Sequence, residues 1–80
     1  MKQITIYDLL PLLKSGYVAM DDGGYWHVFE VKPVLFKEYG LWGRDGEGFI
    51  YPLPNYAFNI APFDGDWKDS LIKVEHKEEE

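Results

Sequence analysis

The absence of cysteine from an 80-residue chain is the feature that most limits how this protein can fold. A chain of this length buries only about 60% of the surface that its unfolded form exposes, so its core is small. Without cysteine it cannot add disulfides or a thiolate metal site, and a thiol nucleophile is excluded as well. The remaining ways of gaining stability are close packing and association with further copies. We therefore expect residues 1–74 to form a single compact domain that assembles into a homo-oligomer.

The net charge is −6, and its distribution along the chain limits the kinds of partner that the protein can bind. Half of the excess negative charge lies in residues 75–80, which we expect to form an acidic, disordered tail. The rest of the chain is only mildly acidic and holds a single arginine. Because phosphate contacts require clustered lysine and arginine, direct binding to nucleic acid is not expected. An acidic face that imitates nucleic acid stays open as an alternative.

The apolar stretches of the sequence are all short. None reaches the roughly 18 residues that a membrane-spanning helix needs. Residues 1–8 contain an acid before the first apolar stretch and lack a signal-peptide cleavage pattern. The lack of cysteine agrees with a reducing compartment. We therefore expect a cytoplasmic protein with no membrane partner.

A short helix is expected near the N-terminus. Thr5 and Asp8 have the spacing of a capping box, and leucines at four of residues 9–13 provide an apolar stripe. Gly16 suits the left-handed conformation that often ends a helix. Pro11 removes an amide donor from the middle of this segment. We therefore predict one helix of about ten residues, bent or restarted at Pro11.

From residue 17 onwards the pattern favours β-strands. Residues 17–21 and 25–31 flank Asp22-Gly23-Gly24, and a glycine pair between aromatic and β-branched residues predicts a hairpin. Pro33 ends the second of these strands or places it at an edge. Residues 34–39 are ambiguous between strand and loop.

The second half of the chain has more strand-like segments. These are residues 41–42, 49–51, 57–63 and 71–74. The glycine-rich stretch at residues 43–48 is interpreted as a hairpin loop, and Asp66 as the cap of a single helical turn. The predicted fold class is α+β, with one short N-terminal helix packed on an antiparallel β-meander of four or five strands.

The polar residues do not form a catalytic set. His27 lies in the middle of an expected strand, and His76 lies in the tail. Neither Ser15 nor Ser70 belongs to a nucleophile elbow. The carboxylates of residues 64–69 match only half of a calcium loop, so they are better explained as helix caps. We therefore expect no enzyme activity, no cofactor and no metal site.

Aromatic residues are the strongest indication of function. They make up 18% of the chain, which is more than one small core can hide. Tyrosine and tryptophan combine flat apolar faces with hydrogen-bonding tips, which suits stacking on a nucleobase at about 1–3 kcal/mol per stack. The alternative is that most of these rings belong to the core or to a subunit interface.

Two segments carry a family resemblance. ITIYDLLPLLKSGYVAM at residues 4–20 and FNIAPFDGDWKDSL at residues 58–71 resemble small proteins of bacteriophages and prophages. The order of elements is similar to that of phage anti-Thoeris proteins, which begin with a short helix ending in Lys-x-Gly and close with a segment like Asp66-Trp67. The resemblance implies a compact oligomer that binds ADP-ribose derivatives or cyclic nucleotides without cleaving them. Residues 17–22 carry no Arg-Lys-x-Trp cluster, so no site residue is transferred by motif.

The leading hypothesis is a phage-encoded anti-defence protein that sequesters a nucleotide-derived immune signal in the cytoplasm of the host bacterium. The expected stacking residues are Trp26, Trp42, Tyr51 and Trp67. Arg44 would contact a phosphate, and Asn59 would bond a base or ribose. The alternatives are an acidic inhibitor of a host nuclease or polymerase and a structural or accessory phage protein.

Overall fold

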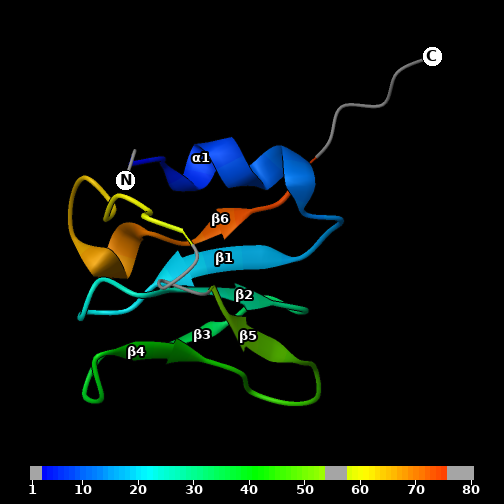
Figure 1. Ribbon diagram of the computed structural model, residues 1–80. Coiled ribbons are helices and arrows are strands. Elements are labelled where there is room, and N and C mark those ends of the chain that lie inside the picture. Colours follow the sequence, from blue (N-terminus) through cyan, green and yellow to red (C-terminus); the bar gives the residue numbers. More distant parts are fainter. Residues whose placement is uncertain (1–2, 54–57, 76–80) are drawn as a thin grey trace.

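The computed structural model describes residues 3–53 and 58–75 and is shown in Figure 1. Its elements in chain order are α1 (Ile6–Leu9), the 3-10 turn η1 (Leu10–Leu12), β1 (Tyr17–Met20), β2 (Trp26–Phe29), β3 (Val34–Phe36), β4 (Leu41–Gly43), β5 (Ile50–Pro52), the 3-10 turn η2 (Trp67–Asp69) and β6 (Ile72–Lys73). The α+β fold class predicted from the sequence is confirmed.

The strands form two antiparallel sheets rather than one. A four-stranded sheet has the order β5-β2-β1-β6, and β3 pairs with β4 in a separate two-stranded ribbon. In Figure 1, α1 and the ribbon lie on opposite sides of the four-stranded sheet. Within the four-stranded sheet, only β1 and β2 are also consecutive in the sequence, so the connectivity differs from a simple meander.

The N-terminal helix is capped as expected, but it is shorter and changes to a 3-10 turn at Leu10. The Thr5 amide donates to Asp8 Oδ2 at 2.8 Å, which is the capping-box contact. Pro11 lies at the start of η1, where its missing amide hydrogen costs little. The Leu13 amide then donates to the Leu10 carbonyl at 3.1 Å and closes the turn. Together α1 and η1 span residues 6–12.

The first hairpin forms where it was predicted. β1 and β2 pair in the register Val18↔Val28, and Asp21 organises the turn between them. Asp21 Oδ1 accepts hydrogen bonds from the Gly23 amide at 2.9 Å and the Tyr25 amide at 3.0 Å. This side chain therefore holds the turn together in the way that aspartate commonly does.

The predicted hairpin around residues 43–48 is wrong. β4 pairs with β3 in the register Leu35↔Trp42, and β5 pairs with β2 in the register Val28↔Tyr51. Residues 43–48 therefore connect the two sheets. The ambiguous segment at residues 34–39 supplies the nearer partner for β4, through a short turn that ends at Gly40 with a φ of +70°.

The expected strand at residues 57–63 is also wrong for the part that the structure describes. Residues 58–63 contribute only one isolated parallel bridge, between Ile60 and Ile4. The Ile4 amide donates to the Asn59 carbonyl at 2.8 Å, and the Ala61 amide donates to the Ile4 carbonyl at 2.7 Å. Pro62 follows immediately and cannot extend a ladder. Residue 57 and tail residues 76–80 lie outside the described residues.

The sheet is buried on both faces. On the helix side the core cluster consists of Ile6, Leu9, Val18, Met20, Trp26 and Val74. Side chains alternate along a strand, so Ala19 and Phe29 point to the other face, toward the ribbon. Both are 1% exposed. Within residues 3–53 and 58–75, no helix is long and apolar enough to cross a membrane.

Candidate functional site

Two cavities flank the four-stranded sheet. The helix-side cavity has a volume of about 520 Å³ and is lined by Thr5, Ile6, Tyr7, Trp26, Ala61, Pro62, Phe63 and Asp64. The ribbon-side cavity has a volume of about 290 Å³ and is lined by Ala19, Asp21, His27, Leu41, Trp42, Gly43 and Ile50. The six residues predicted to form one site therefore do not line a single cavity. Trp26 lines the first cavity, Trp42 lines the second, and the other four line neither.

The helix-side cavity lies where residues 58–64 pass the start of α1. The backbone hydrogen bonds of Ile4 to Asn59 and Ala61 hold this segment in place. The Phe63 amide donates to the sulfur of Met20 at 3.1 Å, which ties the same segment to β1. The cavity wall formed by residues 61–64 is thus fixed both to the residues before α1 and to the sheet.

Trp26 forms the closed end of this cavity rather than a free stacking surface. It is 1% exposed, and its Nε1–H donates to the Ala61 carbonyl at 3.1 Å. Its ring meets Phe63 edge-on, with centroids 6.5 Å apart and an interplanar angle of 76°. Trp26 therefore has little exposed surface, and its stacking on a ligand stays a prediction. Phe63 and the exposed ring of Tyr7 are lining residues that the sequence analysis missed.

Among the described residues, the polar groups that line the helix-side cavity are few and carry no positive charge. Its lining contains Thr5 and Asp64 but no lysine, arginine or histidine. The Thr5 hydroxyl is 3.3 Å from Asp8 Oδ2, so it is partly engaged in the capping box. Asp64 is exposed at the rim. A ligand would therefore meet apolar walls with a hydroxyl and a carboxylate at the edge.

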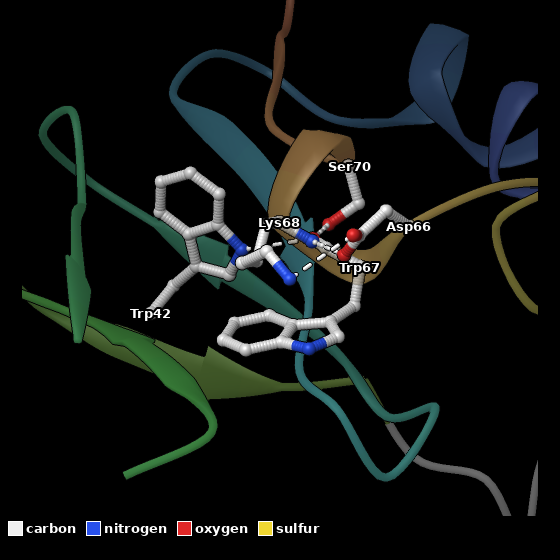
Figure 2. A network of polar contacts seen from close by, with 5 residues as sticks. All are labelled: Trp42, Asp66, Trp67, Lys68 and Ser70. Atoms are coloured by element: carbon white, nitrogen blue, oxygen red, sulfur yellow. Dashed lines mark hydrogen bonds and ion pairs between the residues drawn. The ribbon is translucent and has the colours of Figure 1, made fainter. Parts of the chain in front are cut away.

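Trp42 and Trp67 are joined by a polar network shown in Figure 2. The indole nitrogen of Trp42 points toward the backbone of η2 and donates to the Trp67 carbonyl at 3.3 Å. The Lys68 ammonium lies 5.8 Å from the centroid of the Trp67 ring and 3.0 Å from Asp66 Oδ2. Trp67 is half-buried and packs against the helix-side core. Both tryptophans thus contribute to packing between the ribbon, η2 and the sheet.

Ser70 is the centre of this network, and the sequence analysis did not identify it. Its side chain is 0% exposed. Its hydroxyl oxygen accepts from the Met20 amide at 2.8 Å and lies 2.7 Å from the Trp67 carbonyl, to which it can donate. Nothing in the local sequence distinguishes a buried serine of this kind from an exposed one, because the Met20 amide that donates to it lies 50 residues away in β1.

The acidic segment at residues 64–69 caps a helical turn, as expected. Asp66 is the N-cap of η2, and its Oδ1 accepts from the Lys68 amide at 3.0 Å. This backbone hydrogen bond is the main cause that holds the pKa of the Asp66 carboxyl below its usual value, and the contact with the Lys68 side chain is the second. In the described part of the chain, no group of three or more histidine and acidic side chains could hold a metal ion.

The other predicted site residues lie on the surface. Tyr51 is 58% exposed on β5, and its ring packs beside Phe49 with centroids 4.7 Å apart. The Arg44 guanidinium donates to the carbonyl of Gly48 in its own loop. The side chain of Asn59 is exposed, and its carbonyl is used in pairing with Ile4. None of these residues lines either cavity.

Comparisons with models of protein families, with curated protein sequences and with solved structures found no significant match. What the cavities bind must therefore be argued from their own residues.

Proposed function

We propose that the protein binds the nucleoside part of a nucleotide-derived signal in the helix-side cavity and holds it without chemical change. The observation that carries this proposal is a cavity of about 520 Å³ with Tyr7, Trp26 and Phe63 in its lining. Small-molecule sites usually have volumes of about 300–1,000 Å³ and mostly apolar, aromatic walls. The volume and the lining suit a flat ring with a small polar substituent.

The polar groups at the rim match the hydroxyl-bearing end of a nucleoside. A carboxylate such as that of Asp64 accepts hydrogen bonds only, so it pairs with ribose hydroxyls or an exocyclic amine. The exposed ring of Tyr7 offers a face on which a base can stack. No residue of the lining is placed to act as a nucleophile with an adjacent base, which supports storage rather than turnover.

The charge of the lining predicts how the phosphates of such a ligand behave. Because the described lining of the cavity contains no cation, phosphate groups gain little from entering it and would remain in solvent. We therefore expect affinity to depend on the ring and the ribose and to change little with the number of phosphates. In the cell, such binding would sequester an immune signal, which is the role implied by the resemblance to phage proteins.

The test is calorimetric titration with adenosine, an ADP-ribose derivative and a cyclic dinucleotide. We expect binding of all three, with affinities that differ by less than about tenfold, or about 1.4 kcal/mol. Tyr7→Ser removes the exposed ring from the cavity and should weaken binding by about 1–3 kcal/mol. Tyr25→Ser is the matched control, because Tyr25 has a similar exposure of 55% and lies outside both linings.

Native mass spectrometry then distinguishes storage from turnover. The expected result is an added mass equal to that of the intact ligand, which is released unchanged on denaturation. Absence of binding by all three compounds at millimolar concentration would contradict the proposal, as would equal effects of the two tyrosine substitutions. Those results would favour a host protein as the target.

A further inference from the structure

The ribbon-side cavity is separated from the helix-side cavity by the four-stranded sheet. Ala19 and His27 form a register pair of β1 and β2 and point away from α1, because their neighbours Val18 and Val28 pack on the helix-side cluster. The opposite wall comes from β4, with Leu41, Trp42 and Gly43. A ligand in this cavity would therefore lie between the sheet and the ribbon.

The aromatic wall of this cavity is held in a fixed position. Trp42 is half-buried, and its Nε1–H donates to the carbonyl of Trp67 in η2. This hydrogen bond anchors one edge of the indole ring while the ring lines the cavity. A ring that is already fixed loses little conformational freedom when it binds a ligand. Tryptophan also provides the most favourable aromatic face for a cation.

The carboxylate of this cavity is held in place by the turn of the first hairpin. Both hydrogen bonds of the Asp21 side chain, from the Gly23 and Tyr25 amides, end at Oδ1. In the described part of the chain, Oδ2 is left to accept a hydrogen bond from a ligand. Since the turn fixes Oδ1, the position of Oδ2 is fixed as well.

The charges around the cavity favour a positive ligand. Among the described residues, its titratable side chains are those of Asp21 and His27, it contains no lysine or arginine, and the chain as a whole has a net charge of −6. An anion would be repelled by this field, whereas a cation would be attracted to it. The volume of about 290 Å³ lies at the lower limit for small-molecule sites, which restricts the ligand to a small one.

We propose that the ribbon-side cavity is a second binding site, and that it takes a small organic amine in its protonated form. The ammonium group lies between Asp21 Oδ2 and the face of the Trp42 indole. The apolar part of the ligand packs against Ile50 and Leu41. This proposal is independent of the nucleoside site, because the two cavities share no lining residue.

The test compares phenethylamine with 2-phenylethanol, which has nearly the same shape but no positive charge. Titration is followed by NMR at pH 8, where an alkylamine stays protonated. We expect the amine to bind about tenfold more tightly than the alcohol, because both a carboxylate and a cation–π contact favour the charge. Chemical-shift changes should appear at the Trp42 indole and the His27 ring and not at the Trp26 indole.

Asp21→Asn keeps the Oδ1 acceptor of the turn and removes the charge from the cavity. Asp22→Asn removes the same charge from the adjacent residue, which is exposed and outside the lining. We expect Asp21→Asn to abolish the preference for the amine and Asp22→Asn to leave it within about twofold, since a solvent-exposed charge is screened. Equal binding of the two compounds by the natural protein overturns the proposal. The proposal is also overturned if Asp21→Asn keeps the preference for the amine, or if the chemical-shift changes are centred on Trp26.

Discussion

Gly16 occupies a backbone position that no other residue type can take without strain. Its φ is +108°, and a Cβ atom at this position would collide with the carbonyl oxygen of Phe29. Its own carbonyl accepts a hydrogen bond from the Val74 amide at 2.8 Å. The helical segment already ends at Leu12, with Leu13 as its C-cap, so the expectation that Gly16 ends the helix is wrong. Gly16 instead lets the chain pass close to β2.

The first prediction follows from this close approach. Gly16→Ala should lower the free energy of unfolding by about 3 kcal/mol, because strain at positive φ and a backbone collision act together. Gly24→Ala is the control, since Gly24 has a φ of +88° but no heavy atom within 4 Å of the added Cβ. It should cost only about 1 kcal/mol. Urea denaturation measures both values, and equal losses would show that the collision with Phe29 is not important.

Ser70 gives a second prediction at the residue scale. Ser70→Ala leaves the buried Met20 amide without an acceptor, which should cost about 1–3 kcal/mol. The matched control is Ser15→Ala, since Ser15 is exposed, and it should change the stability by less than about 0.5 kcal/mol. Hydrogen exchange at the Met20 amide should accelerate in Ser70→Ala. An unchanged exchange rate would contradict the role assigned to the serine hydroxyl.

At the scale of elements, η2 is stabilised by an ionised cap. The pKa of Asp66 is lowered by the Lys68 amide and ammonium, so the folded state favours the charged carboxylate more than the unfolded state does. This contribution to stability is present above the ordinary aspartate pKa of about 4 and is lost as the pH falls through the lower pKa of the folded state. The effect is modest because the side chains of Lys68 and Asp66 are 43% and 45% exposed, so solvent screens their attraction.

The corresponding prediction concerns acid stability. The midpoint of urea denaturation should fall as the pH is lowered from about 4 to about 2, and part of this fall should be absent in Asp66→Asn. Asparagine keeps the cap but does not titrate. Asp45→Asn, in the exposed connection between β4 and β5, serves as the control and should follow the natural protein. Identical pH profiles for all three proteins would exclude a contribution from the Asp66 charge.

The outer edge of the four-stranded sheet is protected by a proline. The Leu53 amide donates to the Trp26 carbonyl, and the Glu30 amide donates to the Phe49 carbonyl. Because bonding groups alternate along a strand, residues 49, 51 and 53 face β2, whereas Ile50 and Pro52 face outward. Pro52 has no amide hydrogen, so the exposed edge lacks a donor that another strand would need.

Restoring that donor should promote association. We expect Pro52→Val to increase concentration-dependent self-association, because the new outward amide allows a second chain to pair with β5. Tyr51→Val is the control, since the Tyr51 amide faces β2 and no new edge donor is created. Sedimentation velocity of the two variants at equal concentration measures the difference. Equal behaviour would mean that Pro52 does not limit pairing at this edge.

At the scale of the whole molecule, a helix and a two-stranded ribbon cover opposite faces of one sheet. This arrangement buries much of β1 and β2 on both sides without a disulfide. Several large apolar side chains stay exposed nonetheless, including Leu12 at 76% and Tyr39 at 75%. They agree with the expectation of self-association, which sedimentation of the natural protein would measure.

The last prediction tests the second face of the sheet. Phe29→Leu should lower the stability by about 1–2 kcal/mol, because a shorter side chain leaves a cavity between the sheet and the ribbon. Phe49→Leu, at a position 44% exposed, should cost less than about 0.5 kcal/mol. Urea denaturation distinguishes the two. A cost for Phe29 as small as that for Phe49 would mean that the ribbon does not contribute a core.

Local signals predicted the local structure well. The capping box of Thr5 and Asp8, the helix break at Pro11, the turn at Asp22-Gly23-Gly24 and the cap at Asp66 all depend on contacts within a few residues. Such contacts depend only on the identities of neighbouring residues, so they can be predicted from the sequence alone. The α+β class followed from these elements.

The partners of the strands and the positions of the aromatic rings were decided only by the tertiary structure. From the sequence, β4 could pair with β3 or with β5. It pairs with β3, and this places Trp42 and Trp26 on opposite faces of the four-stranded sheet. Trp26 and Trp42 have the same chemistry, yet Trp26 is 1% exposed on the helix side of the sheet and Trp42 is half-buried on the ribbon side. Burial depends on residues that are distant in the chain, because packing is a property of the assembled layers.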